Sequence, residues 1–162
     1  MARKRRGRGA DPSPTGQSRT LSFNRRAQRD YVVLATLNAG LQLTGTEIKS
    51  MRQGSTSLGE GYVTVRDGEA FLLGVHVARY KPAAAANHDP DRPRKLLLHL
   101  AEIEALAIHL NQGGHTVVPL RLYLSKGWAK VELGLVRGRR AYDKREKIRA
   151  REDARDIARH MR

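Results

Sequence analysis

The chain has 162 residues, a length that suits one domain with a hydrophobic core and some unpacked length. Its formal net charge of +15 predicts a polyanionic partner, with nucleic acid first and an anionic membrane surface second. The absence of cysteine excludes disulfides, thiolate metal sites and cysteine nucleophiles. No apolar run approaches the roughly 18 residues of a membrane span, and the start lacks the apolar core of a signal peptide. We therefore expect a soluble, cytoplasmic protein.

The positive charge is concentrated at the two ends of the sequence. Residues 1–29 hold nine Lys/Arg against one Asp, and residues 137–162 hold eleven Lys/Arg against five Asp/Glu. The part between them is nearly neutral. We predict three regions: a disordered basic extension over 1–22, a folded body over 23–136, and a basic tail over 137–162.

The body begins with a strand and a short helix. Residues 31–37 (YVVLATL) are apolar and β-branched, which predicts a buried strand that Gly40 breaks. Thr44 followed three residues later by Glu47 has the form of a capping box, and Gly54 ends a helix of about ten residues.

A hairpin, a loop and a second helix follow. Asp67-Gly68 between two apolar runs predicts a tight hairpin, because this dipeptide tolerates the positive φ angles of a type I′ turn. Residues 79–95 contain three prolines and predict a long loop. The next segment is predicted to be an amphipathic helix that stops at Gly113-Gly114. Its apolar stripe consists of Leu100, Ile103, Leu106, Ala107 and Leu110.

Residues 116–136 predict a second hairpin around Lys126-Gly127, and its register can be checked on both faces. One face is apolar and pairs Leu124 with Ala129, Leu122 with Val131, and Leu120 with Leu133. The other face is polar and pairs Tyr123 with Lys130 and Arg121 with Glu132. These elements together predict a mainly β fold with α: a small, closed or partly closed antiparallel β-barrel with two or three flanking helices.

No residue pattern supports an enzyme, a metal site or a cofactor. Asn87-His88-Asp89 offers adjacent polar side chains on a loop without a third ligand, and Asx-Pro turn chemistry explains Asp89-Pro90. The motifs of hydrolases, phosphate loops and dinucleotide-binding folds are missing. We therefore expect neither catalytic residues, nor a metal, nor a cofactor.

Two parts of the body are candidate RNA contacts. Arg121, Tyr123, Trp128 and Lys130 interleave aromatic and basic side chains on one sheet face, as base stacking and phosphate contact require. An ordinary solvated sheet face with a partly covered Trp is the alternative. On the short helix, we interpret Glu47 as a cap. We expect the basic residues of this helix, Lys49 and Arg52, to face solvent or RNA.

The tail carries a basic stripe where a helix normally carries an apolar one. At 100° per residue, these side chains fall within about a third of the helix circumference. We predict a tail that is largely unfolded alone and becomes helical when phosphates neutralise the stripe; a merely solvated helix is the alternative. The stripe consists of Arg140, Lys144, Lys147, Arg151, Arg155, Arg159 and Arg162.

Several stretches, in order over roughly residues 24–152, resemble the SsrA-binding protein family, also called small protein B. They are NRRAQRDY (24–31), AGLQLTGTEIKSMRQG (39–54), YVTVRDGEAFLLG (62–74), HDPDRPRKLLLH (88–99), VPLRLY (118–123) and WAKVELGLVRGRRAYDKRE (128–146). The resemblance implies an oligonucleotide-binding-type barrel with a C-terminal tail that is unstructured in the free protein.

The resemblance also implies a function in trans-translation, the rescue of stalled ribosomes. A member of this family binds the tRNA-like part of transfer-messenger RNA and delivers it to the ribosome, with elongation factor Tu engaged indirectly through the RNA. Its tail enters the decoding centre and the empty mRNA channel of the small subunit. We expect a monomer without a membrane partner. A general RNA-binding ribosomal protein or RNA chaperone is the alternative.

The resemblance assigns functional residues position by position. The implied RNA-binding surface includes Asn24, Arg25, Glu47, Lys49, Leu97 and Lys130. The implied ribosome-reading motif of the tail is Gly138, Tyr142, Asp143, Lys144 and Arg145. This chain has Asn38 and Asp153 where the family commonly has an acidic and an aromatic residue, respectively.

Overall fold

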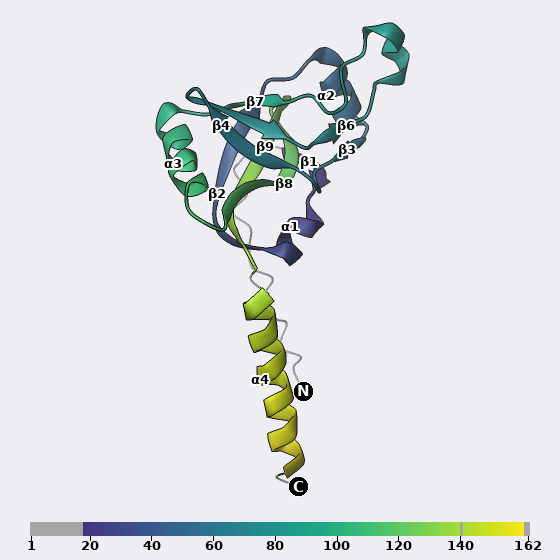
Figure 1. Cartoon of the computed structure of the whole chain (residues 1–162). Helices are drawn as coiled ribbons and strands as arrows, with labels where there is room; N and C mark the ends of the chain where they lie inside the picture. Colours follow the sequence, from purple (N-terminus) through teal and green to yellow (C-terminus); the bar gives the residue numbers. More distant parts are fainter. Residues whose placement is uncertain (1–17, 140, 161–162) are drawn as a thin grey trace, which may run out of the picture.

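The computed structural model describes residues 18–139 and 141–160, which form a curved β-sheet body and a C-terminal helix (Figure 1). The strands are β1 (Ser18–Phe23), β2 (Tyr31–Leu41), β3 (Thr56–Ser57), β4 (Tyr62–Arg66), β5 (Glu69–Leu73), β6 (His76–Val77), β7 (Arg94–Leu97), β8 (His115–Ser125) and β9 (Trp128–Gly138). The helices are α1 (Arg25–Asp30), α2 (Gly45–Arg52), the 3₁₀ helix η1 (Lys81–Ala86), α3 (Leu100–Leu110) and α4 (Ala141–His160).

Seven strands form one antiparallel sheet in the order β1-β8-β9-β2-β7-β5-β4, and β3 pairs with β6 in a small second sheet. The large sheet curves until β4 lies against β8, so that it is a partly closed barrel. Helix α3 covers one side of this barrel, and α1 packs on β2 and β8 (Figure 1). The predicted class, mainly β with flanking helices, is confirmed, while the oligonucleotide-binding-type topology stays a prediction.

The barrel interior holds one main apolar core, and a smaller cluster of Ala27, Val118 and Val136 lies apart from it. The members of the main core alternate along the strands with outward-facing polar residues, as a half-buried sheet requires. Helix α2 adds Met51 and α3 adds Leu106, which close the core on two sides. The fully buried strand residues include Val63, Leu72, Leu96, Val117, Leu122, Val131 and Leu133.

The second hairpin confirms most of the predicted register. Leu124 pairs with Ala129, Leu122 with Val131, Tyr123 with Lys130, and Arg121 with Glu132. The predicted pairing of Leu120 with Leu133 is wrong, because Pro119 pairs with Leu133 and the register shifts between Pro119 and Arg121. A proline has no N–H for the ladder, so it is tolerated in a sheet mainly at such a bulge.

Local signals at the turns and caps are also confirmed. Asp67 and Gly68 have φ angles of 51° and 74° at the tip of the β4–β5 hairpin. The Thr44 N–H donates to Glu47 Oε2 at 2.8 Å, which is one half of the predicted capping box. Helix α3 ends at Leu110, three residues before the predicted glycine stop.

Three boundaries differ from the prediction. Residues 18–22, predicted to be disordered, pair with β8 as part of β1; residues 1–17 lie outside the described part. The strand predicted over 31–37 forms, but Val33 and Leu34 are exposed, because a bulge shifts the register there and this end of β2 pairs only with β9. Gly40 does not break this strand, which continues to Leu41.

In two further segments, the structure contains helices or strand residues that the sequence did not predict. Asn24 caps the short helix α1, a helix that the sequence pattern did not predict. The predicted loop over 79–95 includes η1 and the first residues of β7.

Candidate nucleic-acid interface

A row of aligned residues crosses four strands on the outer surface of the barrel. Tyr123 of β8 lies opposite Lys130 of β9, Lys130 lies opposite Gly40 of β2, and Gly40 lies opposite Leu97 of β7. Neighbouring strands are about 4.8 Å apart, so the row spans roughly 14 Å. The fold thus brings Leu97 and Lys130, both predicted RNA contacts, onto one surface.

Gly40 permits the close approach of Leu97 within this row. A Cβ atom at residue 40 would lie 3.2 Å from Leu97 Cβ, tighter than ordinary side-chain contact. The Leu97 side chain therefore lies over the bare backbone of β2 and remains 55% exposed. An exposed leucine at this place offers an apolar contact to a base or ribose.

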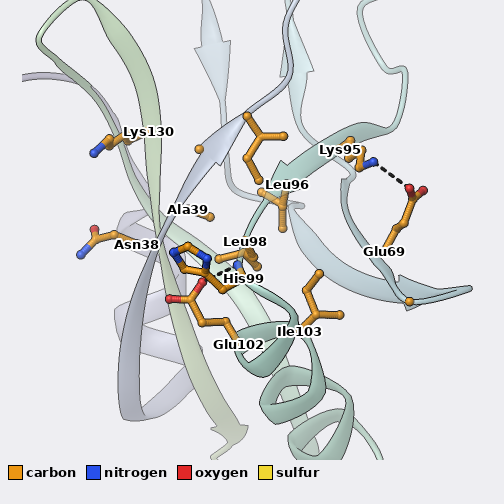
Figure 2. A pocket seen from close by; sticks show the side chains of 13 residues that line it. Asn38, Ala39, Glu69, Lys95, Leu96, Leu98, His99, Glu102, Ile103 and Lys130 are labelled. Carbon is orange, nitrogen blue, oxygen red and sulfur yellow. Dashed lines mark hydrogen bonds and ion pairs between the residues drawn. The ribbon is translucent and has the colours of Figure 1, made fainter.

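A cavity of about 690 Å³ opens beside the row (Figure 2). Two of its acidic side chains are already engaged: Glu69 pairs with Lys95 at 2.7 Å, and Glu102 accepts the backbone N–H of His99 at 2.8 Å. Lys130 forms no salt bridge with any described residue. Its ammonium group is therefore available to an anion at the cavity edge.

Trp128 lies at the tip of the β8–β9 hairpin and is 75% exposed. It pairs with Ser125 at the first position of β9, next to the tight turn at Lys126 and Gly127, whose φ angles are 50° and 80°. An indole ring that the protein leaves uncovered can stack on a base. The prediction of an exposed Trp near Lys130 agrees with this geometry, while its contact with RNA stays a proposal.

Tyr123 and Arg121 are not the free stacking groups that the sequence predicts. Tyr123 is only 5% exposed, because the Arg121 guanidinium lies 4.7 Å from its ring centroid. Arg121 also lies 3.4 Å from a Glu132 carboxylate oxygen. The two residues therefore form part of a cross-strand polar cluster, and the contact of Tyr123 with RNA stays a prediction.

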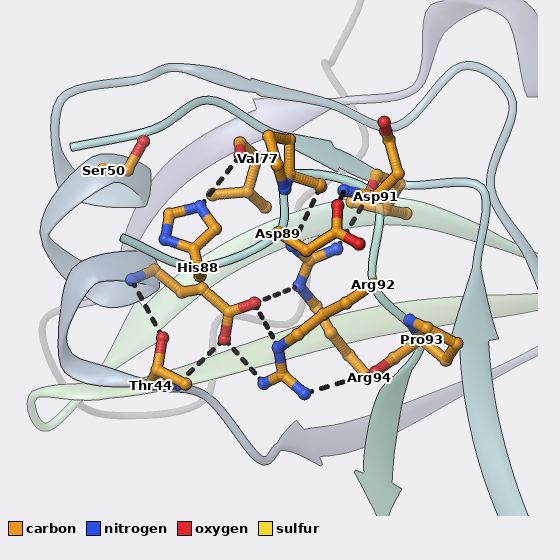
Figure 3. Close-up of polar contacts among 12 residues, drawn as sticks. Thr44, Ser50, Val77, His88, Asp89, Asp91, Arg92, Pro93 and Arg94 are labelled. Atoms are coloured by element: carbon orange, nitrogen blue, oxygen red, sulfur yellow. Dashed lines mark hydrogen bonds and ion pairs between the residues drawn. The ribbon is translucent and has the colours of Figure 1, made fainter. Parts of the chain in front are cut away.

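Glu47 is fully buried, as its predicted role in the helix cap allows, and its contact with RNA stays a prediction. Its carboxylate accepts two hydrogen bonds from Arg92 at 2.7 Å each and one from Arg94 Nε at 2.9 Å (Figure 3). Burial by itself would raise the pKa of Glu47, but the hydrogen bonds from Arg92 and the Thr44 backbone, with the charges of both arginines, lower it below its ordinary value. Through these hydrogen bonds, the buried Glu47 carboxylate connects α2 to the segment that leads into β7.

Asn24 also has a structural role, while its predicted contact with RNA stays a prediction. Its amide nitrogen donates to Pro119 O at 2.8 Å and to Leu58 O at 3.2 Å, while its oxygen accepts from Ala27 N–H. Arg25, the next residue, is exposed on α1, so its side chain is accessible to a ligand.

Lys49 is exposed on α2, with its ammonium 5.6 Å from the Tyr80 ring centroid. Arg25 and Lys49 do not line the cavity beside the row. The structure therefore presents the predicted basic contacts of the body at several separate places.

The tail continues from β9 as α4, which Figure 1 shows extending away from the barrel. Gly138 is exposed and pairs with Tyr31, and the next residue donates its N–H to Asp30 O at 3.2 Å. Arg151 and Arg155 are exposed on α4, whereas Arg140 lies outside the described residues. Other predicted tail contacts lie in α4 where only the backbone is described: Tyr142, Asp143, Lys144, Arg145 and Lys147.

Some features of this surface were not predicted from the sequence. Asn38 was noted only as a departure from a family pattern, yet it lines the cavity and accepts a hydrogen bond from the Tyr123 hydroxyl at 2.8 Å. His99 and Glu102 at the start of α3 also line the cavity. The spacing His-x-x-Glu before an apolar helix was the signal that could have located this helix start.

No group of three or more potential metal ligands occurs among the described residues. None of the helices in the described part of the chain is long and apolar enough to cross a membrane.

A curved antiparallel sheet that carries an exposed Trp, an exposed Lys and a basic C-terminal helix has the features of a nucleic-acid-binding protein. Comparison with known proteins agrees. The pattern of the SmpB protein family matches residues 21–162, and the chain therefore belongs to the SmpB family.

Curated members of this family are similar in sequence to this chain over most of their length. An SsrA-binding protein of Roseiflexus sp. (strain RS-1) is 51% identical, over 88% of this chain and 91% of that protein. An SsrA-binding protein of Solidesulfovibrio magneticus is 48% identical, over 87% of this chain and 92% of that protein. A solved structure described as "tmRNA-SmpB: a journey to the center of the bacterial ribosome" superposes with a TM-score of 0.65 and 43% identity, over 79% of this chain and 94% of that one.

Proposed function

We propose that this protein binds the tRNA-like domain of transfer-messenger RNA and delivers it to stalled ribosomes in trans-translation. Membership of the SmpB family carries the proposal, supported by the likeness to a chain described as SmpB with tmRNA and the bacterial ribosome. The protein acts as a binding and delivery factor in the cytoplasm and catalyses no reaction itself. Elongation factor Tu is engaged through the RNA, without direct contact.

The body supplies the surface for the tRNA-like RNA. Leu97 and Lys130 share one row across the sheet, and the exposed Trp128 lies at the end of the same hairpin. Apolar contact, phosphate neutralisation and base stacking are three of the interactions by which proteins recognise structured RNA. Arg25 and Lys49 extend the electrostatic contact to other parts of the body.

The tail supplies the contact with the ribosome. Its motif from Gly138 to Arg145 reads the decoding centre, with the Tyr142 ring stacked on an rRNA base. The basic stripe then follows backbone phosphates in the empty mRNA channel. The exposure of Arg151 and Arg155 on α4 and the projection of that helix from the barrel in Figure 1 fit this role.

A competition experiment tests the RNA preference. Labelled tRNA-like domain is bound to the full chain at physiological salt and then challenged with unlabelled tRNA-like domain or bulk tRNA. We expect the specific RNA to compete at a concentration at least about tenfold lower, because specific contacts add to the salt-dependent background. Equal competition would instead indicate a general RNA-binding protein or chaperone.

Matched charge variants locate the binding surface. Lys130→Ala removes one positive charge from the row, and Lys81→Ala removes one from the exposed start of the 3₁₀ helix η1. We expect Lys130→Ala to weaken binding by about five- to tenfold, and Lys81→Ala to change it by less than about twofold. If the two substitutions weakened RNA binding equally, the row would not be the binding surface.

A further inference from the structure

Strand β2 has one edge that no other strand covers over most of its length. It pairs with β9 from Tyr31 to Gly40, but its opposite edge pairs with β7 only at Gly40 and Leu41. Every second residue of such a strand points its backbone N–H and C=O away from its partner. Within the described part of the chain, no hydrogen bond from outside the β2–β9 ladder reaches the backbone of residues 32–38. This stretch is therefore open to an added strand.

The same stretch lacks the features that usually protect a strand edge. Natural proteins blunt an exposed edge with charged side chains or with proline. Residues 32–38 read VVLATLN and contain neither. Val33 is 40% and Leu34 is 51% exposed, so the edge is apolar as well as unpaired. An edge of this kind is where another chain can bind.

A groove of about 300 Å³ lies between this stretch of β2 and helix α3, which stand next to each other in Figure 1. Ala35 and Leu37 line it from β2, and Ala101 and Ala105 line it from α3. Ile108, three residues after Ala105 on the same helix, is 65% exposed. The groove thus places apolar side chains beside a free backbone edge. These are the two features by which a sheet binds an extended peptide.

The charge of the groove favours a protein over a nucleic acid. The described residues that line it include no Lys or Arg, although the whole chain has a net charge of +15. Among those lining residues, Glu102 alone carries a charge, and Glu104 is exposed on the same helix. Both carboxylates repel phosphates and attract basic side chains. The matching occupant is an extended segment that combines apolar and basic residues.

Two occupants from this protein itself fit the groove less well. A second copy that paired through its own β2 would bring its own α3 to the same place, whereas about 300 Å³ has room for only a few side chains. Residues 1–17 precede β1, which β8 and β9 separate from β2 in the sheet. Met1 is the only large apolar residue among them. The geometry and the sequence therefore favour a segment of a partner protein.

We propose that residues 32–38 of β2, together with the facing side of α3, bind an extended basic segment of a ribosomal protein, which adds to β2 as a further strand. This inference rests on the proposed function, because that function brings the body to the ribosome. It adds a protein contact to the RNA contacts of the body and the tail. Backbone pairing with β2 supplies the affinity, and the apolar groove and the two glutamates supply the preference for apolar and basic side chains.

Photo-cross-linking on stalled ribosomes identifies the occupant. The photoreactive amino acid p-benzoylphenylalanine replaces Leu34 in the full chain, and the same group in place of Lys81 on η1 is the control. Each chain is bound with transfer-messenger RNA to purified stalled ribosomes and irradiated. We expect residue 34, but not residue 81, to give an adduct that protease destroys and ribonuclease spares, and mass spectrometry should locate it in a basic segment of a ribosomal protein. An adduct with RNA, with a second copy or with residues 1–17, or no adduct at all, would overturn the proposal.

A charge on the strand edge tests the role of this contact. Leu34→Lys places a cation on the edge at a side chain that is already half exposed, and Gln112→Lys adds the same charge after α3 as the control. We expect Leu34→Lys to reduce tagging by at least about threefold, with affinity for the tRNA-like RNA within about twofold and an unchanged melting temperature. Gln112→Lys should change tagging by less than about twofold. Unchanged tagging in Leu34→Lys, or a loss of RNA affinity that accounts for the reduced tagging, would contradict the proposal. Failure of the proposed function is distinct, because then the unaltered chain itself would show neither tagging nor a preference for tRNA-like RNA.

Discussion

The guanidinium of Arg94 lies 2.9 Å from the carboxylate of Glu47, and both side chains are completely excluded from solvent. The same guanidinium donates to Val75 O at 2.8 Å and to Pro90 O at 3.1 Å. The pair thereby joins α2 to the loop before β7 and to the segment after β5. Because β7 carries Leu97, this buried ion pair helps to hold one end of the proposed RNA-binding row in place.

Removing the Glu47 carboxylate should destabilise the fold strongly. Glu47→Ala leaves Arg94 buried without its counter-charge, which typically costs about 3–5 kcal/mol. Urea unfolding of the full chain measures this loss. Glu60→Ala is the matched control, because Glu60 pairs with Arg26 on the surface with 76% of its side chain exposed, and solvent screening leaves such exposed pairs with little effect on stability. Equal losses in the two variants would contradict the structural role of Glu47.

The stability that Glu47 contributes should depend on pH. Its folded-state pKa is lowered, so its contribution is complete above its unfolded pKa of about 4.3 and is lost as pH falls toward the folded value. Glu47→Gln cannot titrate. The difference in unfolding free energy between the unaltered chain and Glu47→Gln should therefore shrink between about pH 5 and pH 3, by up to about 1.4 kcal/mol per pH unit. A constant difference across this range would contradict the prediction.

Gly61 should be intolerant of a side chain. A Cβ atom there would lie 2.6 Å from Pro119 Cγ and 2.9 Å from Val75 Cγ2, and the proline is fixed in the β8 bulge. We expect Gly61→Ala to destabilise the protein by about 1–3 kcal/mol through overpacking. Gly59→Ala is the control, because nothing lies within 4 Å of a Cβ atom at residue 59. Thermal unfolding of the two variants compares them, and equal melting temperatures would be inconsistent with this packing.

The isolated tail should fold only on a polyanion. A peptide of residues 137–162 has a net charge of +6 and few apolar residues, so we expect weak helical circular dichroism in buffer. Adding ribosomes or a model polyanion should raise the helical signal, because phosphates neutralise the repulsion along the stripe. A peptide that is already fully helical in buffer would favour the alternative of a merely solvated helix.

The sequence predicted the parts of the fold that short-range chemistry determines. The register from Arg121 to Val131 followed from one requirement, that a single face be apolar while the other pairs opposite charges. The Asp67-Gly68 turn and the Thr44 cap followed from local backbone geometry. The bulge at Pro119 shows the limit of this approach. The sequence shows that a proline there cannot donate to the ladder, but the register shift that follows depends on the neighbouring strand.

The site was harder to predict because its residues are far apart in the chain. Leu97 and Lys130 meet only because β2 pairs with both β7 and β9. Glu47 appeared to be an ordinary helix cap, since its partners Arg92 and Arg94 lie 45 and 47 residues later. The Tyr123 hydroxyl likewise donates to Asn38, 85 residues earlier. Alternation along one strand places a residue on the outer face, but it does not show what will cover it there.

The central claim is that the body binds the RNA and that the tail acts on the ribosome. A chain ending at Arg139 tests it most directly, because it keeps the pairing of Gly138 with Tyr31 and removes only residues 140–162. Its affinity for the tRNA-like domain and its activity in tagging by stalled ribosomes would be measured beside those of the full chain. The account predicts RNA affinity within about threefold of the full chain and loss of tagging. Loss of RNA binding, or tagging that persists without the tail, would contradict it.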